Sequence, residues 1–267
     1  MTGSRDRTRA SFGYEWTTFD RTHGEDEDYW RGYVAGVPLD ALDGRLGLDA
    51  GCGMARYSRF SAPHLGHLVC MDASGAVSAA AATLRDVPDT SVVQGDLNQP
   101  PFPEGSFGFI QSLGVLHHLD DPESGFRRLL ALLEPGGLLV LYLYSRPETR
   151  GVRAVALRAA SELRRATVRF PFPALRVLSW PLAGLLYALF VVPGEVGRRC
   201  GMKRLASLPL QAYRGKPVHT LWLDTFDRLS APVEHRYTWA ILEPWFIGLT
   251  VRHASESNGW HVVVEKP

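Results

Sequence analysis

The chain has 267 residues, of which 45% are hydrophobic and 21% are charged. These fractions are close to those of globular domains, so wholesale disorder is excluded and one large domain with an insertion is expected. The formal net charge of +1 gives no global signal for nucleic-acid binding. Cys52, Cys70 and Cys200 form neither a disulfide framework nor a metal pattern, which favours a reducing compartment. No apolar leader begins the chain, so a cytoplasmic protein is the expectation.

Short apolar runs alternate with helix-like stretches from Leu46 onward, after a polar and aromatic segment over residues 1–45. Strands are predicted over 46–50, 67–72, 91–94, 108–113 and 138–144, and helices over 55–62, 74–84, 122–133 and 238–246. The end of the chain, from Leu249 through a turn at Glu256–Gly259, predicts an antiparallel hairpin. Strands that are apolar on both faces are typical of a parallel sheet covered by helices. The pattern therefore predicts an α/β, doubly wound Rossmann-like fold.

The first predicted strand runs into a glycine-containing loop made of Asp49, Gly51, Cys52 and Gly53. Glycine lets a backbone pass close to a ligand, and the helix that follows offers unpaired N–H groups. A dinucleotide fingerprint would need a third glycine where Arg56 stands, which disfavours a nicotinamide-dependent oxidoreductase. An ordinary strand-to-helix turn is the alternative interpretation.

Acidic residues end the next two predicted strands. Asp72, followed by Ala73, comes nineteen residues after Gly53, where a carboxylate typically grips a ribose diol. Asp96 and Leu97 follow the third strand, where a carboxylate can accept an adenine amine and a backbone N–H can meet a ring nitrogen. Since ligands bind at the carboxyl ends of such strands, the loop and both acids predict one nucleotide site.

With these motifs the sequence resembles the class I S-adenosylmethionine-dependent methyltransferases, of the type 11 or UbiE-like group. The resemblance is carried by Asp49–Gly53, Asp72, Gly95–Leu97, Pro101–Pro122 and Leu132–Tyr144. It implies a seven-stranded sheet with antiparallel sixth and seventh strands, S-adenosylmethionine as cofactor and S-adenosylhomocysteine as product.

The resemblance also implies places for individual residues. Gly51 and Gly53 would approach the methionine moiety, and Leu113 and Gly114 would lie beneath the sulfonium. Phe12–Phe19 looks like an N-terminal lid that places Tyr14 and Trp16 over the cofactor. Hydrophobic cover of the sheet is the alternative role for these two aromatic side chains.

Methyl transfer is an in-line displacement, so a base is needed only when the acceptor has to lose a proton. His117 and His118 follow the fourth predicted strand and could serve near neutral pH. Similarity to cyclopropane-forming enzymes favours His117 as the base and a structural role for His118; both could simply brace the loop. Tyr144 is a second candidate for the wall of the acceptor pocket. No metal-ligand spacing is visible, so no metal is expected.

Residues 146–204 contain twelve basic and three acidic side chains, together with the uncharged block Val177–Pro193. We predict an N-terminal lid over 1–45, a cofactor-binding core over 46–145, a helical substrate cap over 146–220 with a helix over 151–169, and the end of the core over 221–267. A lipophilic or anionic acceptor, peripheral contact of 146–204 with an anionic membrane, and an ordinary solvated cap are the open roles of the cap. A transmembrane helix is disfavoured because crossing takes about 20 apolar residues.

The expected function is methylation of a small-molecule acceptor, lipophilic or natural-product-like. The alternatives are a catalytically inactive methyltransferase-like binding or scaffold protein and a nucleic-acid methyltransferase.

Overall fold

The computed structural model describes residues 4–18, 26–146, 159, 162–257 and 259–267. The chain divides into two compact units. Unit 1 comprises Met1–Arg146 and Val233–Pro267, and unit 2 comprises Pro147–Pro232. The inserted unit thus ends at Pro232 rather than at residue 220, so the helix α10 (Val218–Ser230) belongs to it.

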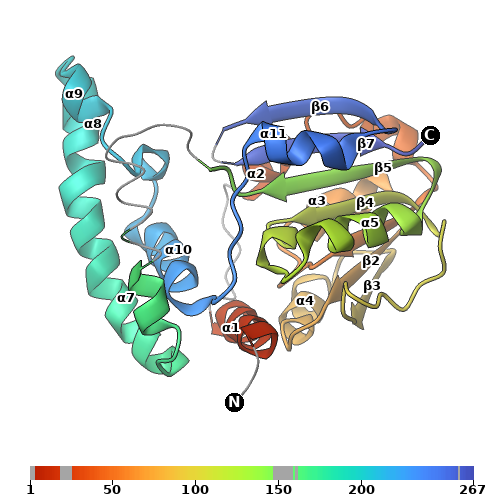
Figure 1. Cartoon of the computed structure of the whole chain (residues 1–267), viewed down its shortest axis with the longest axis horizontal. Coiled ribbons are helices and arrows are strands. Elements are labelled where there is room, and N and C mark those ends of the chain that lie inside the picture. Colours follow the sequence, from red (N-terminus) through yellow and green to blue (C-terminus); the bar gives the residue numbers. More distant parts are fainter. Residues whose placement is uncertain (1–3, 19–25, 147–158, 160–161, 258) are drawn as a thin grey trace. The chain divides into compact units, whose positions relative to one another are not determined.

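Unit 1 is built on one seven-stranded sheet in the order β3-β2-β1-β4-β5-β7-β6 (Figure 1). Strands β1 to β5 pair in parallel, whereas β7 pairs antiparallel with both β5 and β6. Successive strands are added on one side of β1 up to β3 and on its other side from β4 onward, so a switch point lies between β1 and β4. Ligands bind at such a point in open α/β sheets. The strands are β1 (Leu46–Ala50), β2 (His67–Asp72), β3 (Thr90–Gln94), β4 (Phe107–Leu113), β5 (Leu133–Leu143), β6 (Thr250–Glu256) and β7 (Trp260–Glu265). The predicted doubly wound, Rossmann-like fold with an antiparallel terminal hairpin is confirmed.

Helices cover both faces of this sheet because side chains alternate along its strands. In β4, Ile110 joins a core formed with α5 (Pro122–Leu132), α11 (Trp239–Leu242) and the short helix η6 (Glu243–Phe246). The next side chain, Phe109, joins the opposite core with η1 (Leu39–Leu42), η2 (Ala62–His64) and α4 (Val77–Thr83). Both side chains are almost fully buried. Consecutive apolar residues at Phe109 and Ile110 predict such burial on both faces.

Some element boundaries differ from those expected. The fifth strand begins at Leu133 rather than at 138, since Leu133 pairs with Phe107 across an irregularity in the β4–β5 register. The helix expected over 55–62 is shortened to α3 (Ser58–Ser61) followed by η2, because Ala55 has a φ of +60°, outside the helical region, and residues 56–57 form a turn. The helix expected over 238–246 divides into α11 and η6. In the terminal hairpin, Ser257 N–H donates to the Gly259 carbonyl, and residue 258 lies outside the described residues.

The predicted cover over residues 1–45 contains α1 (Ser4–Thr18) and α2 (Asp26–Tyr33). The α2 helix lies against β5 and β7, where Tyr33 packs on Tyr142 and His261. The Trp30 indole of the same helix donates to Ser61 Oγ at 2.7 Å. This helix therefore closes the sheet on the side of η1 and η2.

The described part of unit 2 consists of helices joined by turns and irregular segments, with no strand. It contains α7 (Phe172–Leu186), η4 (Tyr187–Val191), α8 (Val192–Arg199), α9 (Lys203–Ala206), η5 (Gln211–Tyr213) and α10. The α7 helix runs beside α10 (Figure 1), and Trp222 donates from its indole to Ser179 Oγ at 2.8 Å. Of the helix predicted over 151–169, residues 162–167 are helical, and 151–158 and 160–161 lie outside the described residues.

Candidate functional site

The loop after β1 folds back onto the end of β2. Gly51 N–H and Cys52 N–H both donate to the Met71 carbonyl, at 2.7 and 3.0 Å. Gly51 and Gly53 have φ angles of +89° and +54°, a region that favours glycine. A Cβ at Gly53 would lie 2.9 Å from the Trp16 indole nitrogen, and one at Gly51 would collide with the Val115 side chain. Both positions therefore require glycine for conformation and for space.

The Asp72 carboxylate organises the two turns on either side of it. Its Oδ2 accepts from Gly53 N–H at 3.0 Å, and its Oδ1 accepts from Ser74 N–H at 2.8 Å and Ser74 Oγ at 2.7 Å. A carboxylate offers about four acceptor positions, so this one retains capacity for another donor. Asp72 thus joins the glycine loop of β1 to the end of β2.

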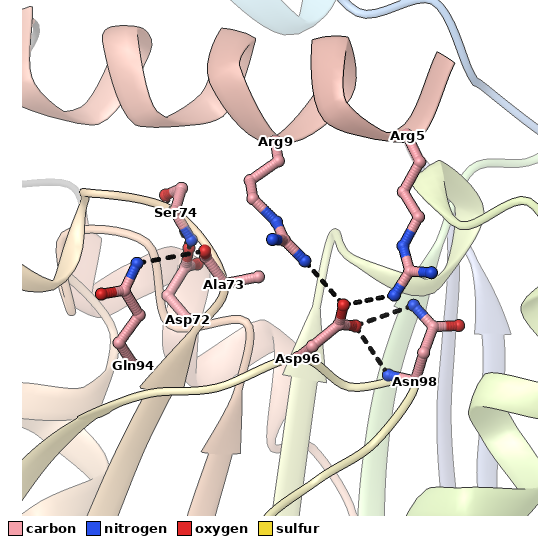
Figure 2. Close-up of polar contacts among 8 residues, drawn as sticks. All are labelled: Arg5, Arg9, Asp72, Ala73, Ser74, Gln94, Asp96 and Asn98. Carbon is pink, nitrogen blue, oxygen red and sulfur yellow. Dashed lines mark hydrogen bonds and ion pairs between the residues drawn. The ribbon is translucent and has the colours of Figure 1, made fainter. Parts of the chain in front are cut away.

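Asp96 is held from two sides (Figure 2). Its Oδ1 accepts from the backbone and the side-chain amide of Asn98, both at 2.8 Å. Its Oδ2 accepts from Arg5 and from Arg9, the latter at 2.6 Å, and both arginines come from α1. Hydrogen bonds from Asn98 and Arg5 outweigh desolvation and hold the pKa of Asp96 below its ordinary value. The acid at the end of β3 is therefore ionised and fastened to the N-terminal helix.

These groups share one cavity of about 290 Å³, entirely within unit 1. That volume is near the lower limit of the roughly 300–1,000 Å³ typical of small-molecule sites. All of the predicted cofactor-binding residues except Tyr14 line it: Trp16, Asp49, Gly51, Cys52, Gly53, Asp72, Ala73, Asp96, Leu97, Leu113 and Gly114. Tyr14 is also in α1 but does not line the cavity. The lining residues of this helix include Arg5, Arg9, Phe12 and Trp16, which recur at helical spacing, and Tyr14 falls between them on another face.

Asp49 belongs to a buried hydrogen-bond chain beneath the glycine loop. Its Oδ2 accepts from Ser58 Oγ at 2.6 Å and from Gln111 Nε2 at 2.7 Å, and Gln111 Oε1 accepts from Ser61 Oγ at 2.7 Å. Burial raises the pKa of Asp49 to about 6; the bonds from Ser58 and Gln111 oppose this shift, and the charge of Asp72 adds to it. The carboxylate is thus the titrating centre of the floor of the site.

The elevated pKa of Asp49 predicts a pH-dependent stability. Because the folded state holds this proton more tightly than the unfolded chain, the free energy of unfolding should fall as pH rises from about 4 to 6. A shift of about two pKa units corresponds to a fall of up to about 3 kcal/mol in the free energy of unfolding. Asp49→Asn, which retains an acceptor oxygen for Ser58 and Gln111, should remove this fall. Urea unfolding across that pH range measures it. Asp86→Asn at an exposed position is the control, and an unchanged slope in Asp49→Asn would contradict the assignment.

The two adjacent histidines have different surroundings. They lie in η3 (Leu116–His118), a 3₁₀ turn in which successive side chains point about 120° apart, so only one of them faces the cavity. That one is His118, which lines the wall and meets Phe12 of α1 with ring centroids 4.7 Å apart. His117 is fully buried and stacks on Tyr144 at 3.8 Å, and neither His117 nor Tyr144 lines the cavity. The expectation that His117 rather than His118 faces the cleft is therefore corrected.

The hydrogen bond of His118 determines its tautomer. His118 Nδ1 lies 2.7 Å from the Val233 carbonyl oxygen, which can only accept, so Nδ1 carries the proton. In the neutral ring the lone pair is then on Nε2. This arrangement, a ring oriented through Nδ1 with Nε2 as proton acceptor, is the one that a general base requires.

The wall includes residues that sequence reasoning missed. Arg5, Thr8, Arg9 and Phe12 accompany Trp16 along one face of α1, and their i, i+3, i+4, i+7 spacing was the available signal. Arg56, which marks the departure from the dinucleotide fingerprint, lies over the rings of Trp16 and Tyr57 at 5.1 and 4.6 Å. Within the described residues, no three His, Cys, Asp or Glu side chains group as metal ligands.

A parallel sheet with this strand order, and with a glycine loop and two acids at its switch point, defines a nucleotide-binding Rossmann-like domain. Residues 48–141 match the family described as a methyltransferase domain. Residues 48–141 therefore carry a methyltransferase domain of the class I S-adenosylmethionine-dependent type, whose cofactor is S-adenosylmethionine.

Known proteins are similar over parts of the chain or in fold. An uncharacterised protein of Synechococcus sp. is 33% identical over 124 residues, which are 41% of this chain and 29% of that protein. An uncharacterised methyltransferase of Mycobacterium tuberculosis is 26% identical over 103 residues, 39% of this chain and 52% of that protein. The chain thus aligns with about a third to a half of these relatives' length. Magnesium protoporphyrin IX methyltransferase of Synechocystis, solved with bound S-adenosylhomocysteine, shares the fold at a TM-score of 0.56 and 13% identity, covering 98% of both chains.

Proposed function

We propose that this protein transfers the methyl group of S-adenosylmethionine to a small-molecule acceptor, lipophilic or natural-product-like. The observation that carries the proposal is one cavity of unit 1, whose wall combines the glycine loop, Asp72, Asp96 and an oriented His118. The bound cofactor supplies a methyl group activated by a sulfonium. The protein has to bind, align and desolvate the reactants, which is where most of the rate of an in-line displacement can arise.

The residues present fit this cofactor. Gly51 and Gly53 form part of the cavity wall with backbone alone, which suits a close approach of the methionine moiety; a Cβ at either position would meet Val115 or Trp16. Asp72 keeps acceptor capacity for the ribose diol beside its bonds to Gly53 and Ser74. Leu97 borders the space proposed for the adenine ring, and Asp96 can accept from the adenine amine once Arg5 or Arg9 releases it, because its four acceptor positions are filled by Asn98, Arg5 and Arg9. Leu113 and Gly114 border the space expected for the sulfonium.

His118 is the residue we assign to proton removal when the acceptor is an O–H, N–H or activated C–H group. Its Nδ1–H bond to Val233 leaves Nε2 to accept the proton. His117 and Tyr144 stack behind it and support the ring from outside the cavity, with ring centroids of His117 and His118 4.3 Å apart. The alternative, in which His117 is the base and Tyr144 lies on the acceptor wall, predicts the opposite kinetic behaviour of the two histidine variants.

The lipophilic character of the acceptor is supported by unit 2. Its longest helix exposes apolar side chains, and arginines stand at both of its ends. Such a segment suits an acceptor or a surface that combines an apolar part with an anionic group, in a cytoplasmic protein with peripheral contact to a membrane. The role of this unit as a substrate cap stays a prediction.

Calorimetry with S-adenosylmethionine and S-adenosylhomocysteine tests the cofactor assignment, and formation of S-adenosylhomocysteine with a panel of small-molecule acceptors tests the reaction. Cofactor binding without turnover on any acceptor class would favour the alternative of a catalytically inactive binding or scaffold protein. Turnover on nucleic acid alone would favour the other alternative. No binding of either cofactor form would refute the proposal.

The arginine pair on α1 predicts an effect on cofactor exchange. Arg5 and Arg9 fasten the N-terminal end of α1 to Asp96, while its Trp16 end lies on Gly53, so α1 lies along the cavity from one acid to the glycine loop. Exposed ion pairs contribute about 0.2–1 kcal/mol each. Arg5→Gln with Arg9→Gln should therefore speed both association and dissociation of S-adenosylmethionine by roughly 2- to 30-fold. Stopped-flow tryptophan fluorescence measures both rates.

Arg31→Gln on α2, which removes an exposed pair with Glu27, is the control and should leave both rates unchanged. High salt should bring the wild-type rates toward those of the double variant, because salt screens exposed pairs. Identical rates in the wild type and the double variant would show that α1 is not fastened in this way.

A further inference from the structure

An apolar stripe runs along the long helix of unit 2. α7, η4 and α8 form one continuous helix, Phe172–Arg199, which is long and apolar enough to cross a membrane by length and composition. Exposed apolar side chains recur along it at spacings of three, four or seven residues, which place them on one face. We call this face the apolar stripe: Leu178, Leu185, Leu189, Val192 and Val196, with exposed fractions between 46% and 55%.

The opposite face of the helix is already covered within unit 2. Leu175, Ser179 and Ala183 are fully buried, and α10 lies alongside them. Trp180, which remains about half exposed at the border of this face, stacks edge-on against Trp222 of α10 with ring centroids 4.8 Å apart. One face of the helix is therefore packed and the other is presented, as in helices that lie in a membrane interface.

The charges around the stripe are of one sign. No acidic side chain occurs between residues 163 and 194, whereas Arg169 and Arg176 precede the stripe and Lys203 and Arg204 follow it. Glu195 is neutralised by Arg198 and Arg199, with N–O distances of 2.6 and 2.7 Å, and these bonds lower its pKa to about 2. A second copy of the chain would oppose this basic surface with another. An anionic lipid surface complements it.

We infer that the apolar stripe and its basic ends dock unit 2 onto an anionic bilayer surface. The helix lies in the interface and does not span it. The uncharged stretch Val177–Gly194 is only about 27 Å long at 1.5 Å per residue, against a hydrocarbon thickness of about 30 Å. Spanning would also draw the charged side chains of the packed α10, such as Asp224 and Arg228, into lipid. The inference deepens the proposed function by naming the surface from which a lipophilic acceptor is reached, and lipid binding itself requires no methyl transfer.

The test is co-sedimentation of the full chain with vesicles of phosphatidylcholine alone or of phosphatidylcholine with phosphatidylglycerol. We expect binding to the anionic vesicles, at least tenfold weaker binding to the neutral ones, and loss at high salt, which screens such contacts. Leu185→Glu with Leu189→Glu should abolish binding. Because both positions are about half exposed, the helix should still form, which circular dichroism verifies.

The matched control is Ile241→Glu with Ile247→Glu, which adds the same charge at exposed apolar positions of unit 1 and should retain binding. An equal loss of vesicle binding in both double variants would refute the role of the apolar stripe. Equal binding to neutral and anionic vesicles, or a wild type that binds neither, would also refute the inference. Light scattering measures the oligomeric state. A wild-type dimer that becomes a monomer in the Leu185→Glu, Leu189→Glu variant would show that the apolar stripe binds a second copy of the chain instead. Calorimetry with S-adenosylmethionine on the same variants reports on the cofactor site separately, so failure of the lipid inference leaves the methyltransferase proposal standing.

Discussion

Asp72→Ala should weaken the binding of S-adenosylmethionine by about 10- to 150-fold, the equivalent of roughly 1.5–3 kcal/mol for a hydrogen bond to a charged group. The carboxylate lies at the end of β2 on the cavity wall and keeps acceptor capacity for the ribose diol. Isothermal calorimetry measures the loss. A well-folded Asp72→Ala protein with unchanged affinity would refute the ribose assignment.

Asp72 also holds the backbone at Gly53 and Ser74, so a loss of affinity has to be separated from a disturbed loop. A cofactor analogue that lacks the ribose hydroxyls makes the separation. If Asp72 binds the diol, the wild type and Asp72→Ala should bind the analogue with similar affinity, since the two changes remove the same contact. Ser74→Ala, which removes the hydroxyl bonds to Asp72 and from Ala76 N–H but keeps the backbone bond to Asp72, is the structural control and should bind the natural cofactor nearly as well as the wild type.

The parallel half of the sheet was predictable because its strands are short apolar runs buried on both faces. Residues 46–50 and 67–72 were predicted to the residue. The acids at their ends followed from the same pattern, since strand ends of a parallel sheet meet at one edge. Asp49, Asp72 and Asp96 accordingly line one cavity.

The contacts of α1 were beyond such reasoning. Arg5 and Asp96 are 91 residues apart, and nothing in either local pattern specifies their pairing. A sequence places side chains on faces of elements, but the face that meets a given strand end depends on tertiary packing. The same holds for the boundary of unit 2. The helix α10 lies beside α7 through contacts such as Trp222 with Ser179, which no linear pattern indicates.

Of the two adjacent histidines, His117 and His118, only one can act as a base on the cavity wall, and the structure and the sequence resemblance favour different ones. A resemblance favoured His117, whereas the 3₁₀ turn η3 directs His117 into the core against Tyr144 and His118 to the cavity. Because adjacent side chains in such a turn diverge, the sequence His-His alone could not decide between them.

His118→Ala should lower the turnover rate by about 10²–10⁴ on an acceptor that has to lose a proton, with cofactor affinity little altered. The reason is that Nε2 of His118, in the tautomer set by the Val233 carbonyl, is the proton acceptor on the cavity wall. The measurement is the rate of S-adenosylhomocysteine formation as a function of pH. In the wild type this rate should depend on the protonation of a base, and in the variant that pH dependence should flatten. Added imidazole should restore part of the rate, since the truncated side chain opens onto the cavity.

His117→Ala separates positioning from proton transfer. His117 is fully buried, so its loss should lower stability, while the pH dependence of turnover should be retained and imidazole should have no effect. The opposite result, in which His117→Ala flattens the pH profile and His118→Ala does not, would return the role of base to His117. Full activity in both variants would mean that transfer depends on alignment alone, and that the two histidines serve only to brace the end of β4.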